Sequence, residues 1–207
     1  QRFLMSIKLY QNDIPSNLDL GKIIAIDTET MGLNPIKDRL CLMQISTGNE
    51  DVYLVKFEKK ISPAINLKKI LEDEKVIKIF HYARFDMAMI KYHLKIDVNS
   101  VYCTKIASKI IRTYTDRHGL KDLCKELLNV DISKQQQSSD WGREFLSNDQ
   151  KKYAAQDVLY LHRIKDILDE MLIRENRIEI ANECHKFLST QVKLDLLGWN
   201  DTNIFSH

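Results

Sequence analysis

Two acidic residues follow directly on a short apolar segment near the start of the chain. Asp27 and Glu29 come after the run Ile-Ile-Ala-Ile at residues 23–26. Residues at positions i and i+2 of a β-strand project from the same face, so both carboxylates are expected to lie together at the end of a strand. Taken alone, this D-x-E pattern is better explained as two solvated acids at a strand terminus.

A third acidic residue, Asp86, stands among apolar side chains in the segment HYARFDMAMI. It falls in the first turn of a helix predicted to begin at Ala83, where the positive end of the helix dipole favours an acid. That position alone would explain an acid here, without any catalytic role. Against this explanation, an unpaired carboxylate between Phe85 and Met87 would be costly to bury.

A tyrosine and a fourth acid, Tyr153 and Asp157, lie four residues apart in the segment YAAQDVLYL. On the helix predicted there, positions i and i+4 share one face. The small alanines between them allow this helix to approach a sheet closely. The alternative, an exposed aspartate beside a half-buried tyrosine, is left open by the segment itself.

Taken together, these acids predict a metal-dependent hydrolase. Two strand–helix junctions and a late helix would supply oxygen ligands suited to two divalent cations, Mg²⁺ or Mn²⁺, from Asp27, Glu29, Asp86 and Asp157. Two such ions about 3.5–4 Å apart activate a water and stabilise the entering and leaving oxygens of phosphodiester hydrolysis. Tyr153 would orient that water rather than deprotonate it, because the reference pKa of tyrosine is about 10.

The elements that must position these residues begin with three short apolar runs, Lys22–Ile26, Leu40–Ser46 and Val52–Phe57. All three are rich in Ile, Val, Leu and Tyr, which is typical of strands. Gly, Asn and Pro residues mark turns in the two connections between them. We therefore expect the sheet to begin as consecutive antiparallel hairpins.

After these runs the pattern alternates between strand and helix. We expect strands at Val76–Phe80 and near Ser100–Tyr102, with a polar loop at Ser133–Asp140. Helices are expected at Leu67–Glu72, Ala83–Leu94, Thr104–Ile111, Leu120–Leu128, from about Asn148 to Arg174, and onward to about Leu197. This order predicts an α/β protein with a ribonuclease H-like fold, a mixed central sheet flanked by helices. Residues 5–207 are expected to form a single domain with a helical and aromatic tail, and residues 1–4 are interpreted as a remnant ahead of Met5.

The composition favours a globular protein with a short substrate. The chain has 207 residues, 44% of them hydrophobic and 29% charged, with a formal net charge of +2. Proteins that follow a long duplex show a stronger basic bias. No apolar run reaches the roughly 20 residues that cross a bilayer, and no signal-peptide pattern opens the chain, so we expect neither membrane association nor secretion. The widely spaced cysteines are expected to be buried reduced thiols rather than zinc ligands.

The acids and the tyrosine resemble, in order and spacing, the three exonuclease motifs of the DEDDy superfamily, which includes ribonuclease D. The matching segments are D-T-E-T at Asp27–Thr30, the central Asp86, and Y-x-x-x-D at Tyr153–Asp157. The resemblance to ribonuclease D runs from about Lys22 to Leu168 and implies a DEDD exonuclease fold. We expect the accessory C-terminal nucleic-acid-binding domains of that enzyme to be absent.

A closer resemblance, over Met5 to His207, is to the NrnC (nanoRNase C) group of bacteria. The segments that carry it include DTETMGLNP, RTYTDRHGLK, ISKQQQSSDW and YAAQDVLYLHR. It implies a 3′→5′ exoribonuclease that degrades very short single-stranded RNA, preferentially dinucleotides, to 5′-mononucleotides. It also implies a cytoplasmic homo-octamer. By the same resemblance, Asp27, Glu29, Asp86 and Asp157 would be metal ligands and Tyr153 would orient the water.

Further residues are predicted to contact the RNA. In dinucleotidases with the pattern D-x-E-x-x-G-L, the leucine acts as a wedge against the bases, and here Gly32 and Leu33 occupy the last two positions. An ordinary apolar loop residue is the alternative for Leu33. The remaining predicted contacts are Thr30, His81, Phe85, Arg112, Arg117 and His118.

Some of these contacts have simpler explanations. His81 follows an apolar strand beside the proposed site, and a core or capping histidine is the alternative. Arg112, Arg117 and His118 form a cationic segment suited to a terminal phosphate, whereas a solvated turn is the alternative. Together with the polar segment 133–141, this cationic segment supplies the material for a cap over the 5′ side of a dinucleotide.

Two other functions are alternatives to a dinucleotide-preferring exoribonuclease. A broader ribonuclease D-like exonuclease would trim longer RNA or DNA 3′ ends. A catalytically inactive binding module is disfavoured, because such relatives typically lose a metal ligand and every motif residue is present here. The apolar tail Phe187–His207 is expected to dock on a neighbouring subunit, with packing onto its own domain as the alternative.

Overall fold

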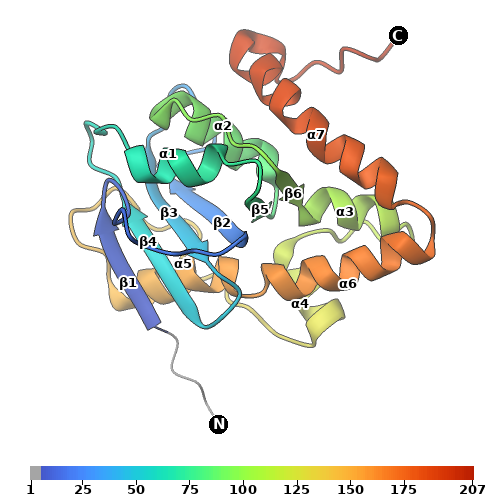
Figure 1. The fold of residues 1–207 in the computed structure, drawn as a ribbon, viewed down its shortest axis with the longest axis horizontal. Helices are drawn as coiled ribbons and strands as arrows, with labels where there is room; N and C mark the ends of the chain where they lie inside the picture. Colours follow the sequence, from blue (N-terminus) through green and yellow to red (C-terminus); the bar gives the residue numbers. More distant parts are fainter. Residues whose placement is uncertain (1–5) are drawn as a thin grey trace.

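The protein was analysed as a computed structural model that describes residues 6–207. The interpretation of residues 1–4 as a remnant therefore lies outside the described residues. A six-stranded mixed sheet runs through the centre in the order β1-β4-β3-β2-β5-β6 (Figure 1). The strands are β1 (Ser6–Gln11), β2 (Ile23–Thr30), β3 (Leu40–Ser46), β4 (Asp51–Lys56), β5 (Ile77–Phe80) and β6 (Val101–Cys103).

Helices cover both faces of this sheet (Figure 1). They are α1 (Ile65–Glu72), α2 (Ala83–Leu94), α3 (Thr104–Ile111), α4 (Leu120–Leu128), α5 (Asn148–Leu159), α6 (Leu161–Arg174) and α7 (Ile178–Leu194), followed by a π-helical turn, η1 (Asp195–Trp199). The predicted ribonuclease H-like fold, a mixed sheet flanked by helices, is confirmed. Among residues 6–207, no helix has the length and apolar character that spanning a membrane requires.

The predicted hairpins are confirmed by the strand pairing. Strand β3 pairs antiparallel with both β2 and β4, while β5 and β6 join the other side of β2 in parallel. Strand β1 was not predicted. It pairs in parallel with β4 at the edge of the sheet, where several of its residues are exposed, so it lacks the apolar run that marks the other strands.

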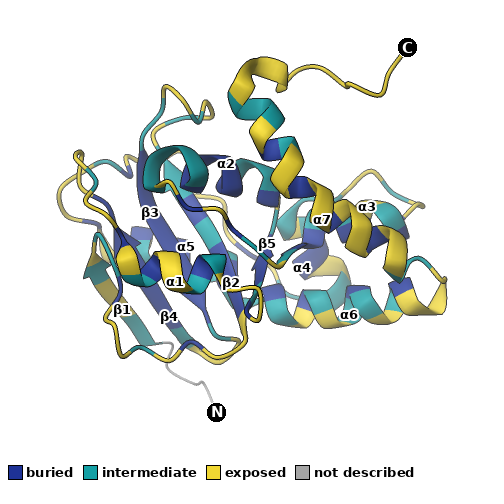
Figure 2. Ribbon diagram, turned by 45° about the horizontal axis from the view of Figure 1, so that its top comes forward, coloured by how far each residue is buried: buried dark blue, intermediate teal, exposed yellow. Residues whose placement is uncertain are grey.

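Two apolar clusters lie on opposite faces of the sheet, and β2 contributes to both. Ile24 and Ile26 pack in a cluster with residues of α1, α2 and α7. Ala25 packs in the second cluster, with residues of α3, α4, α5 and α6. Figure 2 shows the sheet as a buried layer between these helices. Successive β2 residues thus face α2 and α5 in turn, which decides where the acids of this strand point.

The single long helix predicted from Asn148 to Arg174 is wrong. The helix is interrupted at Tyr160, whose φ of −103° and ψ of −6° depart from regular α-helical values, and the chain divides there into α5 and α6. Helix α5 packs against the sheet, whereas α6 packs mainly against α3 and α4 (Figure 1). Buried residues continue at helical spacing across the break, from Ala154 and Val158 to Leu161 and Ile164. The sequence pattern therefore carries no signal of the bend.

The cysteines and the C-terminal helix agree in part with expectation. Cys41, Cys103 and Cys124 are buried, but Cys184 is exposed, and the described residues contain no disulfide. The final helix ends at Leu194, a little before the predicted boundary, and η1 continues it to Trp199. Residues 200–207 are exposed.

Candidate active site

Asp27 and Glu29 lie within β2 rather than after it, because the strand runs on to Thr30. Both residues share the face of Ala25, which α5 covers, and α5 brings Asp157 to the same place. One oxygen from each of the three carboxylates lies within 4.8 Å of the others. Sequence positions 27, 29 and 157 are therefore brought together as the motif spacing predicted.

Gln44 of β3 holds two of these acids in place. It is fully buried and lies directly across from Asp27 in the antiparallel register. Its amide nitrogen donates to Asp27 Oδ2 and to Glu29 Oε1, each at 3.2 Å. Gln44 was not predicted as a site residue, although a glutamine inside the apolar run LCLMQIS is a visible signal.

Asp86 approaches from the other side of β2. Thr28 points to the α2 face, and its hydroxyl donates to Asp86 Oδ1 at 2.5 Å. The second oxygen, Oδ2, is buried without a hydrogen-bond partner among the described residues. Asp86 is thus a neighbour of the cluster of three acids rather than a member of it, with one oxygen left for a further ligand.

The four carboxylates carry more negative charge than a buried site tolerates by itself. Burial raises the pKa of Asp27 to about 7 and that of Asp157 to about 8, with repulsion from Asp27 adding to the second shift. Burial and neighbouring acids also hold the pKa values of Glu29 and Asp86 well above the usual range. Hard oxygen donors, mutual repulsion and an unpartnered buried oxygen all fit divalent cations.

Tyr153 lies one helical turn before Asp157 on α5 and is 9% exposed. Burial raises the pKa of its hydroxyl, and the nearby Asp157 raises it further, so the group stays protonated. The indole of Trp141 packs beside it, with ring centroids 6.0 Å apart. A protonated, laterally supported phenol can hold a water by hydrogen bonding but does not act as a base.

A capping box fixes the start of the helix that carries Tyr153 and Asp157. Ser147 Oγ accepts from the Gln150 amide at 3.1 Å, and Gln150 Oε1 accepts from the Ser147 amide at 2.9 Å. The side-chain nitrogen of Gln150 also donates to Ser139 Oγ at 2.6 Å and to the Asp140 carbonyl at 3.1 Å. The polar loop before α5 is therefore tied to the helix, whose N-cap is Ser147.

The predicted wedge, Leu33, projects into solvent with 86% of its surface exposed. Its loop is well defined, because Thr30 Oγ1 donates to the Gly32 carbonyl at 2.6 Å and Asp38 Oδ2 accepts from the Asn34 amide at 2.8 Å. A Cβ atom on Gly32 would lie 2.4 Å from the Asp38 carboxylate, so a larger residue there would displace that carboxylate from the Asn34 amide. Thr30 and Gly32 thus shape the loop, and Leu33 is the residue left free to meet a ligand.

Phe85 and His81 lie on either side of the start of α2. Phe85, with Leu33, lines a pocket of about 560 Å³. His81 Nδ1 lies 2.9 Å from Thr104 Oγ1. Burial and the charge of Lys105 lower the pKa of His81 to about 3, so the ring is neutral at physiological pH. Tyr82, between them, has a positive φ of 72°, is exposed and lines the same pocket, and it was not among the residues predicted from the sequence.

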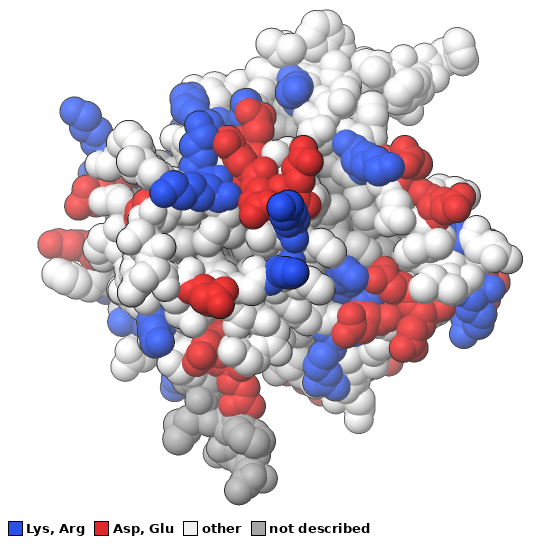
Figure 3. All heavy atoms as spheres, in the orientation of Figure 1, with Lys and Arg blue, Asp and Glu red and all other residues white. Residues whose placement is uncertain are grey.

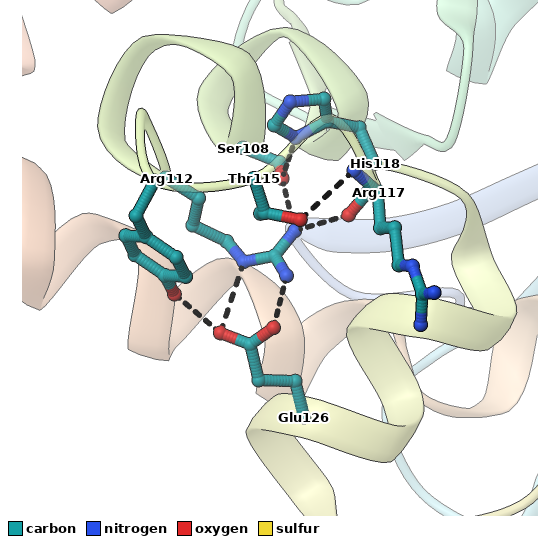
Figure 4. A network of polar contacts seen from close by, with 7 residues as sticks. Ser108, Arg112, Thr115, Arg117, His118 and Glu126 are labelled. Atoms are coloured by element: carbon teal, nitrogen blue, oxygen red, sulfur yellow. Dashed lines mark hydrogen bonds and ion pairs between the residues drawn. The ribbon is translucent and has the colours of Figure 1, made fainter.

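The predicted phosphate contact of Arg112 needs correction. Figure 4 shows its guanidinium enclosed by a polar network, and the side chain is fully buried. It pairs with Glu126 of α4, and Nη1 donates to Ser108 Oγ at 2.9 Å and to the Arg117 carbonyl at 2.7 Å. These bonds hold the loop in shape instead of offering charge to a substrate.

The other two members of the cationic segment differ from Arg112. The Arg117 side chain is exposed and extends away from the network in Figure 4. The ring nitrogen Nδ1 of His118 lies 2.8 Å from Ser108 Oγ. Arg117 is therefore the member whose charge is available, and Arg112 positions its backbone.

Comparison with known proteins places this geometry in a family. The family model described as "3′-5′ exonuclease" matches residues 11–173. That range contains every acid of the site and Tyr153. The match therefore covers the whole arrangement from β2 to α6.

Solved structures of NrnC from Brucella melitensis are similar to the chain over almost its full length. One, with bound Mg²⁺, is 50% identical with a TM-score of 0.94, covering 98% of this chain and 100% of that one. Another, bound to pGG, is 51% identical with a TM-score of 0.95, covering 99% and 100%. Both the fold and the chain length are thus shared.

A curated relative is more distant. Ribonuclease D of Gluconacetobacter diazotrophicus is 31% identical over 159 residues, which are 75% of this chain and 39% of that protein. The chain therefore spans well under half the length of this relative, and the alignment speaks for the shared exonuclease part only.

Proposed function

The chain belongs to the 3′-5′ exonuclease family, and from that premise we propose that it hydrolyses very short RNA, preferentially dinucleotides, from the 3′ end to 5′-mononucleotides. The observation that carries the proposal is the cluster of Asp27, Glu29 and Asp157, whose oxygens lie within 4.8 Å of one another. The strand that holds two of these acids, β2, leads directly into the loop that carries the exposed Leu33, the predicted base-separating residue.

Four carboxylates would hold the cations in this proposal. Asp27, Glu29 and Asp157 present oxygens from one side of β2, and Asp86 presents its unpartnered Oδ2 from the other. Two bound Mg²⁺ or Mn²⁺ ions would supply charge that activates water and stabilises the leaving oxygen. Gln44 donates to both carboxylates and would keep Asp27 and Glu29 at a fixed spacing when the cations bind.

The remaining step is the placement of the water. Tyr153 keeps its proton, so its hydroxyl directs the water at the phosphorus without removing a proton from it. The water adds to phosphorus and gives up a proton to solvent, the bond from phosphorus to the 3′ oxygen of the preceding nucleotide breaks, that oxygen takes up a proton to become a 3′ hydroxyl, and a 5′-mononucleotide leaves. Trp141 limits the freedom of the phenol ring during this step.

A preference for short RNA is supported by three features. Leu33 stands exposed at the mouth of the pocket it shares with Phe85. Acidic and basic side chains are mixed over the face in Figure 3, in keeping with the net charge of +2. The similar NrnC of Brucella melitensis has been solved with pGG. A protein that tracks long nucleic acid would need more positive charge.

The proposal extends to assembly and location. We propose a cytoplasmic homo-octamer, on the likeness to the NrnC group. Exposed apolar residues gather on α7 and the tail, where Figure 2 shows a largely exposed outer surface; they are Ile180, Phe187, Leu197, Trp199, Ile204 and Phe205. Truncation after Leu194 should then lower the sedimentation coefficient, and an unchanged assembly would contradict the role of the tail.

The decisive experiment is a timed digest of 5′-labelled RNAs of two to seven residues, under single turnover, with and without chelator. We expect dinucleotides to be cleaved fastest and chelator to stop cleavage. The variant Asp157→Asn, with the fold checked by circular dichroism, should be inactive. Equal rates on two- and seven-residue RNA would favour the broader ribonuclease D-like activity instead.

A further inference from the structure

The chain turns back after α7 and forms a short hook, residues 195–201, that lies against α2 (Figure 1). Gly198 makes the turn with φ +106°, a left-handed conformation that favours glycine. Leu196 packs against the apolar cluster that α2 and α7 share. The hook therefore has a defined place relative to the helix that carries Asp86.

Arg84 of α2 holds this hook by a two-pronged ion pair with Asp195. Arg84 Nε donates to Asp195 Oδ2 at 2.6 Å and Nη2 donates to Oδ1 at 2.7 Å. Nη2 also donates to the Asn200 carbonyl at 2.8 Å, and Gln191 Nε2 donates to Asp195 Oδ1 at 2.8 Å. The Asp195 side chain is only 10% exposed, so water screens this pair less than a surface pair.

The hook forms one wall of the pocket that Leu33 and Phe85 line. Residues of the loop after β2, between 33 and 38, and residues of α2 also line this pocket. Arg84 thus joins the hook to α2, two residues before Asp86. Positions i and i+2 of a helix do not face each other, so Arg84 adds nothing to the metal site directly and acts through the hook.

The lining of this pocket is acidic. Asp38, Asp195 and Asp201 contribute carboxylates, while Arg84 is the single basic residue among the described ones that line it, and Asp195 neutralises it. Such a lining accepts an uncharged base next to Leu33. It repels the additional phosphates that a longer RNA would have to bring past the hook.

We propose that Arg84 is a positioning residue for substrate length. By fixing the hook, it keeps the far wall of the pocket where a second nucleotide fits beside Leu33 and a third does not. This inference rests on the proposed function for its substrate, RNA, and adds the residue that enforces its length. It predicts a change in binding and selectivity, not in the chemical step.

The test compares Arg84→Met and Arg84→Lys with a matched control, Lys91→Met. Lys91 lies on the same helix and pairs with Asp97 at 2.7 Å, but it borders a different pocket. Hydrogen exchange of residues 195–201 is measured together with kcat and KM on 5′-labelled RNAs of two and seven residues. Arg84→Met should speed exchange in the hook, raise KM on the dinucleotide about tenfold and leave kcat nearly unchanged.

The ratio of kcat/KM on seven-residue RNA to that on dinucleotide should rise about tenfold in Arg84→Met. Arg84→Lys, which keeps the charge without the planar fork, should fall between this variant and the wild type. The control should match the wild type throughout.

Several outcomes would overturn the inference. Unchanged hydrogen exchange in the hook of Arg84→Met would show that the Arg84–Asp195 pair does not hold the hook. Faster exchange with an unchanged ratio of kcat/KM between the two RNA lengths would show that the hook plays no part in selectivity. A fall in kcat with KM unchanged would place Arg84 at the reacting atoms instead. If the proposed function is wrong, the wild type itself will cleave both RNA lengths equally. Hydrogen exchange of residues 195–201 would still show whether Arg84 holds the hook.

Discussion

Gln44 lies directly across from Asp27 in the β2–β3 pair, and its amide nitrogen reaches both Asp27 and Glu29 at 3.2 Å. The strand register therefore supplies the donor that spaces these two acids. Replacing groups that orient ligands in this way typically lowers metal affinity by about 10- to 100-fold. The site extends from the acids into the interior of the sheet.

Replacing Gln44 by Leu should weaken the apparent affinity for Mg²⁺ by about tenfold or more, because both acids lose the donor that fixes their spacing. The fold should persist, since β3 is apolar and fully buried. Met43→Leu, on the opposite face of the same strand, is the matched control. Activity measured over a Mg²⁺ titration tests this, and an unchanged midpoint in the Gln44 variant would contradict it.

Tyr153→Phe should reduce kcat by about 10²-fold while leaving Mg²⁺ affinity unchanged, because it removes the hydroxyl that directs the water and spares every carboxylate. Tyr160→Phe, at the break between α5 and α6, serves as a control for loss of a tyrosine hydroxyl nearby. Single-turnover rates at saturating Mg²⁺ give the comparison. A comparable loss in both variants would point to a structural effect instead.

The chelated protein should lose stability as pH rises from about 4 to 8. Burial raises the pKa of Asp27 to about 7 and that of Asp157 to about 8, above the usual value of 3.8. Between those limits the folded state binds more protons than the unfolded state, so the free energy of unfolding falls with rising pH. Saturating Mg²⁺ should offset this loss, since cations replace the protons.

Thermal unfolding at several pH values, with Mg²⁺ or with chelator, measures the effect. The gap in Tm between the two conditions should widen toward pH 8. Asp157→Asn should narrow that gap in Tm, because it removes one of the carboxyl groups whose pKa is raised. A gap that is constant with pH would show that protons and metal do not compete for these groups.

Local sequence patterns predicted the parts of the site that depend on a single element. Asp27 and Glu29 share a strand face, and Tyr153 and Asp157 share a helix face, whatever surrounds them. Gln44 was missed because its role depends on the register between strands. The bend at Tyr160 was missed because the buried stripe runs through it without interruption.

Arg112 shows the same limit for charged residues. Within RTYTDRHG it is one of three basic residues, with Arg117 and His118, and nothing local distinguishes it from Arg117. Its burial follows from the position of Glu126 on α4, which packs beside it only in the folded chain. Which cation faces solvent is therefore decided by tertiary contacts.

Arg112→Met should lower the free energy of unfolding by about 2 kcal/mol, because the Arg117 carbonyl and the Ser108 hydroxyl lose a buried donor, while the exposed Glu126 loses its partner at little cost. Lys125→Met, which breaks an exposed pair with Asp131 on the same helix as Glu126, should have little effect. Denaturant unfolding of both variants decides the matter. Equal stability would show that the network in Figure 4 contributes nothing to the fold.

Arg117→Ala, by contrast, should leave stability unchanged and act on the substrate. Its exposed side chain is the free charge of the segment, and it extends away from the Arg112 network (Figure 4). If it meets the 5′ phosphate, the variant should bind 5′-phosphorylated dinucleotides about tenfold more weakly and unphosphorylated ones as before. Lys121→Ala, an exposed cation at the start of α4, is the control. Equal losses on both substrates would mean that the 5′ phosphate is bound elsewhere.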